Sequence, residues 1–288
     1  VVWLTGSLTA KTKREAIAKC SSGEAQLIIG THAVFQKDVE FKQLGLVVID
    51  EQHRFGVEQR LALVNKGQNE LHPHQLMMSA TPIPRSLAMS YYADLDVSSI
   101  DELPPGRTPI KTLLINNVRR KEVIKFVQQH ACLGNQAYWV CPLIEESEKL
   151  ELENAINTHE ELTNALAPIK VGLVHGKMKS KDKAEVMADF TANWTQVLVA
   201  TTVIEVGVDV PNASIMVIEH SERMGLAQLH QLRGRVGRGS TESQCVLLYE
   251  GNPSEVAKQR LKVISSSNDG FEIARQDLLI RGPGELLG

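Results

Sequence analysis

The sequence predicts an α/β protein with parallel sheets, from three observations. Short aliphatic runs alternate with amphipathic stretches, as expected of βαβ units whose strands are buried on both faces. A length of 288 residues is enough for about two ordinary domains. A hydrophobic share of 43% with 23% charged residues is typical of a globular protein that buries real cores. The predicted strands lie at residues 1–5, 26–30, 44–50, 75–80, 110–115, 136–141, 171–175, 197–202, 214–220 and 245–250.

Helices are predicted between these strands wherever apolar residues recur at helical spacing. Two stretches show the pattern most clearly, residues 118–131 and residues 182–194. Their apolar faces are Val123, Ile124, Val127 and Ala131 in the first, and Val186, Met187, Phe190 and Trp194 in the second.

A proline-rich segment, "DELPPGRTP" at residues 101–109, predicts a boundary between two domains. Consecutive prolines and a glycine exclude both a helix and a regular strand, and they suit an extended linker. We therefore expect a first domain at 1–107, a second at 108–250 and a C-terminal region at 251–288.

The C-terminal region is predicted to be a helical hairpin that ends in the loop "IRGPGELLG". Asn252, Pro253 and Glu255 suit the cap, first turn and third position of one helix. Asp269 and Glu272 resemble a capping box at the start of the next. The apolar faces of the two helices are Ala257, Leu261 and Ile264 in the first, and Phe271, Ala274 and Leu278 in the second.

Charge, cysteine content and hydropathy limit the kinds of binding surface and the cellular compartment that the sequence supports. The net charge of −3 implies that any nucleic-acid surface is a local patch. The four cysteines are far apart without a CxxC pair, so a disulfide framework or zinc site has little support and a reducing compartment such as the cytoplasm fits. We find no membrane-length apolar run and no signal-peptide pattern in "VVWLTGS", which reads as a buried strand, so we expect the chain to begin inside a domain.

Two adjacent acids, Asp50 and Glu51, end the apolar run "LGLVVID". Ligands of open parallel sheets collect at the carboxyl ends of strands. One carboxylate there can hold Mg²⁺ while its neighbour orients or deprotonates a water, the division of labour that phosphoryl transfer needs. The alternative is that both acids simply end a strand and face solvent.

Hydroxyl residues follow the next predicted strand, in "QLMMSATPIPR". Ser79 and Thr81 could relay the state of the acid pair through hydrogen bonds, although both residue types also form ordinary turns. His72 and His74 lie just before, and two histidines around a proline favour a surface turn over a metal site.

The stretch "GLAQLHQLRGRVGRG", residues 225–239, predicts a helix with one apolar and one polar stripe. The apolar stripe is Leu226, Leu229, Leu232 and Val236, and the polar stripe is Gln228, Gln231, Arg235 and Arg238. A single face would then present two guanidinium groups, which suit bidentate phosphate contact and a role as arginine fingers. Arg233 points away from that face.

The order of these segments resembles superfamily 2 helicases. "DEQH" is similar to helicase motif II, "SATPIPR" to motif III, "VLVATTVIEVGVDVP" to motif V and "QLRGRVGRG" to motif VI. The resemblance covers the whole chain and is closest to the RecG family of bacterial ATP-dependent branched-DNA helicases, through "DEQHRFGVEQRLAL", "DELPPGRTPI" and the terminal "NDGFEIARQDLLIRGPGELLG". It implies two RecA-like lobes, the first truncated at its N-terminus, followed by a translocation hairpin.

The resemblance also implies roles for individual residues around ATP and Mg²⁺. Asp50 would be the magnesium ligand and Glu51 would activate water. Residues that would couple nucleotide state to DNA or link the lobes are Gln52, His53, Ser79 and Thr81. Residues that would reach the nucleotide are Gln231, Arg235 and Arg238 of motif VI, with Glu205, Gly207 and Asp209 of motif V at the same cleft.

A further set would contact or move branched double-stranded DNA, such as stalled replication forks and Holliday junctions, in recombination and repair. These residues are Thr31, His32, Thr201, Thr202, Arg260 and Arg281. A lone His32 could instead be structural, and Arg281 could merely stabilise its loop. The lysines of "KMKSKDK", residues 177–183, could follow phosphates or be a solvated helix start. We expect a monomer without membrane contact.

Three other functions stay open. The transcription-repair coupling factor shares the hairpin, although its loop usually lacks a proline at the position of Pro283. A non-catalytic interaction module with a degenerate helicase fold is disfavoured by the intact acids and arginines. RNA unwinding is disfavoured by the hairpin.

One part of such a motor, the phosphate-binding loop GxxxxGK[ST], does not occur in the sequence. The only "GK" is Gly176–Lys177, which Met178 follows. We therefore expect the chain to be the C-terminal portion of a longer helicase, truncated inside its first lobe.

We predict that these 288 residues alone show no ATPase activity, because nothing in them can cradle the β and γ phosphates. A steady-state phosphate-release assay with and without branched DNA tests this. DNA-stimulated hydrolysis at a normal rate would contradict it.

Overall fold

The computed structural model describes residues 1–51, 66, 72–79, 96, 98, 100, 102, 107–142, 148–201, 210–239 and 241–281, with only the backbone at 148–151 and 281. The chain forms two compact units, Val1–Ala80 and Thr81–Gly288. The structure is an α/β protein with parallel sheets, as the sequence predicts. The three-part division at 107 and 250 stays a prediction.

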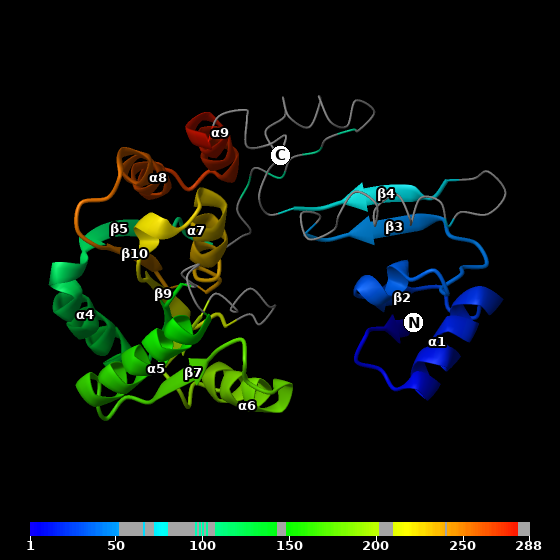
Figure 1. The fold of residues 1–288 in the computed structure, drawn as a ribbon, viewed down its shortest axis with the longest axis horizontal. Helices are drawn as coiled ribbons and strands as arrows, with labels where there is room; N and C mark the ends of the chain where they lie inside the picture. Colours follow the sequence, from blue (N-terminus) through cyan, green and yellow to red (C-terminus); the bar gives the residue numbers. More distant parts are fainter. Residues whose placement is uncertain are drawn as a thin grey trace. The chain divides into compact units, whose positions relative to one another are not determined.

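The first unit contains two pairs of parallel strands (Figure 1). β1 (Val2–Leu4) pairs with β2 (Ile28–Gly30), and β3 (Leu46–Ile49) pairs with β4 (His74–Met77). Helix α1 (Ala10–Ser22) joins the first pair, and a 3₁₀ helix, η1 (His32–Phe35), follows β2.

The core of the first unit lies on one side of these strands. Alternate strand residues, including Leu4, Val47 and Ile49, pack with Ala16 and Cys20 of α1. The intervening residues are apolar and exposed: Trp3, Ile29, Leu46, Val48 and Leu76. These strands are therefore apolar on both faces, as expected of a parallel sheet built to be covered on both sides.

The second unit is built on a six-stranded parallel sheet with the order β5-β10-β9-β6-β8-β7. Its strands are β5 (Lys111–Asn116), β6 (Gln136–Val140), β7 (Val171–Val174), β8 (Val197–Ala200), β9 (Ala213–Ile218) and β10 (Gln244–Tyr249). Its helices are α4 (Arg120–Cys132), α5 (Glu148–Ala165), α6 (Ser180–Thr191), α7 (Leu226–Arg233), α8 (Glu255–Ser266) and α9 (Gly270–Arg281), with short 3₁₀ turns at η3 (Asn117–Arg119) and η5 (Ser221–Arg223).

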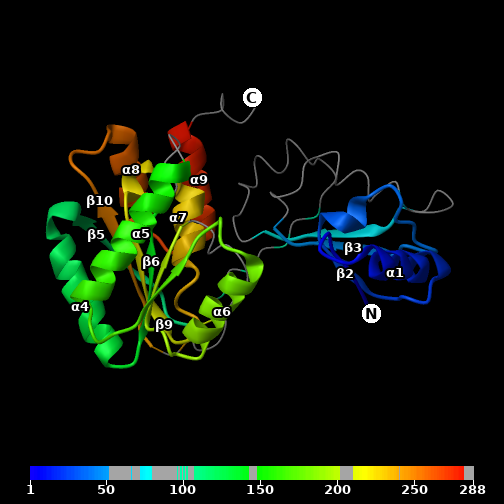
Figure 2. The same cartoon turned by 60° about the horizontal axis from the view of Figure 1, so that its bottom comes forward.

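Helices cover both faces of this sheet (Figure 2). On one face, Trp139 of β6 and its neighbours pack against α4 and α5, for example against Val127 and Leu162. On the other, Tyr138 and its neighbours pack against α6, α7, α8 and α9, for example against Phe190. Every residue of β6, β8 and β9 is buried, so the prediction of strands buried on both faces is confirmed for the centre of the sheet.

The predicted helix faces are confirmed for α4 and α8. All four apolar residues predicted for α4 are buried, and so are Ala257, Leu261 and Ile264 of α8. The predicted cap of α8 is wrong, because the helix begins after Ser254 rather than Asn252. The Ser254 hydroxyl accepts a hydrogen bond from the backbone N–H of Ala257 at 3.2 Å.

The predictions for α6 and α9 are wrong in part. Helix α6 ends at Thr191, and because Asn193 adopts a left-handed conformation with φ of 60°, Trp194 leaves the helical stripe and is exposed. In α9, Ile273 is the buried residue while Phe271 is exposed. Asp269 does cap α9, accepting a hydrogen bond from the N–H of Phe271 at 2.8 Å.

Candidate functional site

The acid pair lies directly after β3, at the carboxyl end of a parallel strand. The Asp50 carboxylate accepts a hydrogen bond from the backbone N–H of Glu51 at 2.9 Å. Glu51 adopts a left-handed backbone conformation with φ of 51°, which is uncommon for a residue with a side chain. The chain therefore turns sharply at the pair, leaving Asp50 exposed and Glu51 half-buried.

The register of β3 and β4 brings Ser79 to the same edge. Ile49 is paired with Met77, and the N–H of Met78 donates to the carbonyl of Ile49 at 2.8 Å. Asp50 and Glu51 continue one strand while Ser79 continues the other, so the proposed acid and hydroxyl motifs are spatial neighbours. The other predicted coupling residues, Gln52, His53 and Thr81, lie outside the described residues.

Thr31 and His32 follow β2 in the first unit, and both are exposed. The backbone N–H of Thr31 donates to the carbonyl of Leu4 at 3.3 Å, which extends the β1–β2 pairing by one residue. The His32 ring lies 6.2 Å from that of Phe35. Both residues thus lie at the junction between β2 and η1.

In the second unit, α7 carries three of the four residues of the apolar stripe that the sequence predicts, and Val236 follows in the next loop. Leu226, Leu229, Leu232 and Val236 are all buried. The predicted guanidinium-bearing helix face is wrong, however, because α7 ends at Arg233. Arg235 and Arg238 lie in the glycine-rich loop that follows the helix, which we call the arginine loop, residues 234–239.

Two glycines allow this loop to leave the helix. Gly237 has φ of 80°, a left-handed conformation that favours glycine. A Cβ on Gly239 would come within 2.3 Å of the carbonyl oxygen of Pro211, which is too close for any side chain. The loop therefore closes tightly against the unit, with Gln231 and Arg235 half-buried and Arg238 exposed.

Arg107 holds this loop, although it lies in the segment that the sequence analysis interprets only as a linker. Its Nε donates to the carbonyl of Gly237 at 3.0 Å and its Nη2 to the carbonyl of Gly234 at 3.1 Å. Sequence reasoning missed this residue because its partners are backbone carbonyls some 130 positions away, which leave no motif.

Arg233 points away from the polar stripe, as predicted, and is 2% exposed. Its Nη1 donates to the carbonyls of Ile264 at 2.6 Å and Ser267 at 2.8 Å, at the end of α8. Its Nη2 lies 3.1 Å from Nδ1 of His230. Burial, with Arg233 adding to it, lowers the pKa of His230 to about 4, so this ring is neutral and can accept that hydrogen bond.

Arg260 makes a second connection, between α8 and the segment before α7. Its Nη1 donates to the carbonyl of Met224 at 3.1 Å. Together with Arg233, it fastens the predicted hairpin to α7 at both of that helix's ends. The side chain of Arg281 lies outside the described residues.

The carboxyl ends of β7 and β8 carry His175 and Thr201. Within the described residues, the Nδ1 of His175 and the buried hydroxyl of Thr201 have no hydrogen-bond partner. Burial, then Lys183 and Lys177, lowers the pKa of His175. Lys183 donates to the carbonyl of Gly176 at 2.9 Å. Four motif V residues, Thr202, Glu205, Gly207 and Asp209, lie outside the described residues.

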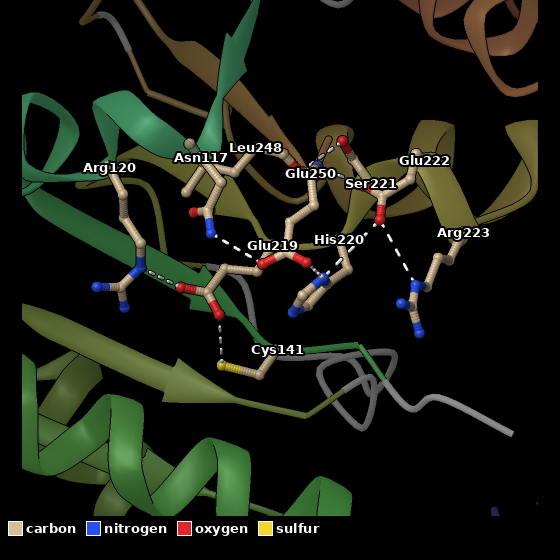
Figure 3. Close-up of polar contacts among 10 residues, drawn as sticks. All are labelled: Asn117, Arg120, Cys141, Glu219, His220, Ser221, Glu222, Arg223, Leu248 and Glu250. Carbon is tan, nitrogen blue, oxygen red and sulfur yellow. Dashed lines mark hydrogen bonds and ion pairs between the residues drawn. The ribbon is translucent and has the colours of Figure 1, made fainter. Parts of the chain in front are cut away.

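A charged network occupies the carboxyl ends of β6, β9 and β10 (Figure 3). Glu219 accepts hydrogen bonds from Arg120 Nε at 2.8 Å and from Trp139 Nε1 at 2.9 Å. Arg120 also pairs with Glu161 at 2.6 Å. Burial opposes the charge on Arg120, but the two carboxylates outweigh it and raise the pKa of Arg120. This network joins α4 and α5 to the centre of the sheet.

His220, next to Glu219, lies between two further carboxylates (Figure 3). Its Nδ1 is 3.8 Å from both Glu222 and Glu250. The Glu222 carboxylate raises the pKa of His220 against the effect of burial, and Glu250 and Glu219 add to the rise. His220 has φ of 48°, so the chain turns here from β9 toward α7.

Among the described residues, no group of three or more His, Cys, Asp or Glu side chains could enclose a metal ion, and no helix is long and apolar enough to span a membrane. All four cysteines are free. His74 is the first residue of β4 rather than part of a turn.

Comparisons with known proteins identify two helicase models. The DEAD/DEAH box helicase model matches residues 1–90, and the helicase conserved C-terminal domain model matches residues 114–240. The chain is 61% identical, over all of its length, to the ATP-dependent DNA helicase RecG of Escherichia coli strain K12, of which it covers 42%. It is 50% identical, again over its whole length, to the RecG protein of Bacillus subtilis, of which it also covers 42%.

A solved structure of RecG bound to a three-way DNA junction matches with a TM-score of 0.74 and 47% identity, over 99% of this chain and 36% of that one. A structure of S. cerevisiae Dbp5 bound to RNA and ADP BeF3 matches at 15% identity with a TM-score of 0.61, which shows a shared fold alone. The chain thus spans less than half the length of its curated RecG relatives.

We predict that the His220 cluster stabilises the fold mainly at lower pH. The folded-state pKa of His220 is raised, so its stabilising effect is fully present below the ordinary value of about 6.5 and is lost as pH rises through the folded-state pKa. His220→Gln should therefore reduce the free energy of unfolding most below pH 6.5 and least at alkaline pH. Urea unfolding across pH measures this, with the exposed His72→Gln as control. An equal loss at every pH would contradict it.

Proposed function

Because this chain belongs to the RecG family of superfamily 2 helicases, we propose that it forms the motor portion of an ATP-dependent DNA helicase that remodels branched DNA. Its substrates would be stalled replication forks and Holliday junctions, in recombination and repair. One observation carries the proposal: an acid pair ends a parallel strand in one unit, and a clamped arginine loop follows a buried helix in the other.

In the first unit, Asp50 is proposed to hold Mg²⁺ and Glu51 to activate the attacking water. The residues fit this role, because Mg²⁺ in nucleotide sites is held by one or two carboxylates together with phosphates and water rather than by an all-protein cage. Asp50 is one exposed carboxylate directly after a strand. When bound, Mg²⁺ would neutralise charge on the β and γ phosphates. Glu51, turned by its left-handed backbone, would accept the proton of water.

In the second unit, Gln231, Arg235 and Arg238 are proposed to reach the triphosphate. A guanidinium stabilises the charge that builds up on the transferred phosphoryl group, and its planar fork matches phosphate oxygens. Glu205, Gly207 and Asp209 of motif V are proposed for the same cleft. Gln52, His53, Ser79 and Thr81 would couple the nucleotide state to DNA.

Contacts with DNA are proposed for Thr31, His32, Thr201 and Thr202, and transmission of domain motion for Arg260 and Arg281. The exposure of Thr31 and His32 at one strand end supports the first set. The buried hydroxyl of Thr201 at the end of β8 also supports it. No residue in the described part of the chain bonds to this hydroxyl, and a buried polar atom without a partner is costly unless a ligand supplies one. Arg260 supports the second set through its bond to the segment before α7.

The complete protein would supply the phosphate-cradling loop that this chain lacks. ATP would then bridge the two lobes through the acids of one and the arginines of the other, and hydrolysis would loosen that bridge. The resulting change in lobe arrangement would move duplex DNA. We propose that the protein acts as a monomer in the cytoplasm.

We predict that Arg235→Ala in the full-length protein lowers kcat for ATP hydrolysis by roughly 10³-fold or more, the size expected for an arginine finger. Binding to a three-way junction should be unchanged, because Arg235 is assigned to the nucleotide. Phosphate release and fluorescence anisotropy with labelled DNA measure the two quantities.

The matched control is Arg119→Gln, since Arg119 is an exposed arginine of the same unit, at the end of η3, that pairs with Glu122 in the first turn of α4. It should leave both quantities unchanged. Normal ATP turnover by Arg235→Ala, with wild-type protein active, would show that Arg235 is not an arginine finger.

A further inference from the structure

We infer that Arg107 is a positioning residue for phosphoryl transfer: it fixes the arginine loop so that Arg235 and Arg238 are held in the geometry the transition state requires. This inference rests on the proposed function, because it assigns Arg107 an effect on the arginines that would contact ATP. Arg107 itself is not assigned any contact with the nucleotide.

The first support is the position of the two carbonyls that Arg107 binds. They belong to Gly234 and Gly237, and the residues between them are Arg235 and Val236. One planar guanidinium therefore spans the backbone on both sides of Arg235. Arg238 follows immediately after the second carbonyl. A shift of Arg107 would move the backbone that carries both proposed fingers.

The second support is the backbone of the loop itself, which continues from α7 in tight turns: the N–H of Arg235 donates to the carbonyl of Leu232 at 3.0 Å, and the N–H of Val236 to that of Arg233 at 3.3 Å. Gly234 ends α7, and Gly237 adopts a left-handed conformation, so two of the four residues from 234 to 237 are the most permissive type. Val236 is fully buried and anchors the centre of the loop. Arg107 holds the carbonyls on either side of Val236. It therefore fixes the direction of the loop backbone, while the burial of Val236 fixes how closely the loop packs against the unit.

The third support is the packing of the residues that follow Arg107. A Cβ on Gly237 would lie only 3.0 Å from Cγ1 of Ile110. The next residue, Lys111, begins β5, and its N–H donates to the carbonyl of Ser243 at 3.0 Å beside β10. The segment from Arg107 to Ile110 thus packs against the arginine loop, and its attachment to the sheet keeps it there.

An arginine is required for this function, and a lysine would not replace it. The two hydrogen bonds come from Nε and Nη2 of one rigid group, whereas a lysine ammonium is a single point on a flexible stem. Arg107→Lys keeps the positive charge and removes the pair of hydrogen bonds from one rigid group. The substitution therefore separates positioning from electrostatic attraction.

The test uses the full-length protein with Arg107→Lys, Arg107→Ala, Arg235→Ala and the double variant Arg107→Ala/Arg235→Ala, with Arg119→Gln as control. Misplacement of a catalytic group by about 1 Å can cost on the order of 100-fold in rate. We expect both Arg107 variants to lower kcat by roughly 10- to 100-fold. The KM for ATP should change little, because the interaction lost is made in the transition state.

The double variant distinguishes positioning from general damage. If Arg107 acts through the loop, its loss should lower kcat by a smaller factor in the Arg235→Ala background than in the wild type, because one of the two fingers it positions is already absent. If Arg107 has a purely structural role, each of the two substitutions should lower kcat by its own factor, and the two factors should multiply in the double variant. Thermal unfolding of each variant shows whether it is folded, and Arg107→Lys supplies the comparison should Arg107→Ala fail to fold.

The inference is overturned by folded Arg107 variants with wild-type kcat, or by losses that multiply in the double variant, while wild-type protein hydrolyses ATP. Failure of the wild-type full-length protein to hydrolyse ATP with branched DNA present would overturn the proposed function, and this inference with it.

Discussion

The parallel alignment of the strands is the constraint on which the rest of the structure depends. In a parallel sheet, the carboxyl ends of all strands meet at one edge, so polar residues that follow strands far apart in the sequence become neighbours. This places Asp50 and Glu51 beside Ser79 in the first unit. It also gathers Glu219, His220 and Glu250 in the second, where burial of β6, β8 and β9 on both faces fixes the edge in space.

A second layer of organisation is the use of arginines as structural clamps around motif VI. Arg107 holds the arginine loop from the side of β5, while Arg233 holds α7 to the end of α8. Because Arg233 is almost fully buried, its carbonyl partners must stay in place, and removing one member of such a buried network typically costs several kcal/mol. Motif VI is therefore held at Arg233, Gly234 and Gly237, which are the residues that precede and separate the two arginines that we assign to ATP.

The fold was largely predictable from the sequence, and the RecG resemblance is confirmed by the comparisons. All ten predicted strands exist, and the apolar faces of α4 and α8 are as expected, because hydrophobic periodicity reports burial directly. The end of α7 was not predicted, since extending the helical period past Gly234 ignored how readily glycine leaves a helix. Arg107 was missed because hydrogen bonds to distant backbone carbonyls have no signature in sequence.

We propose that nucleotide brings the acids of the first unit and the arginines of the second together. Distances between spin labels at Lys11→Cys on α1 and Lys125→Cys on α4, in full-length protein with the exposed Cys132 replaced by serine, test it most directly. A non-hydrolysable ATP analogue should shift and narrow the distance distribution, and Arg235→Ala combined with Arg238→Ala should abolish that change. A distribution unaltered by bound nucleotide, or equally altered in the arginine variant, would contradict the account.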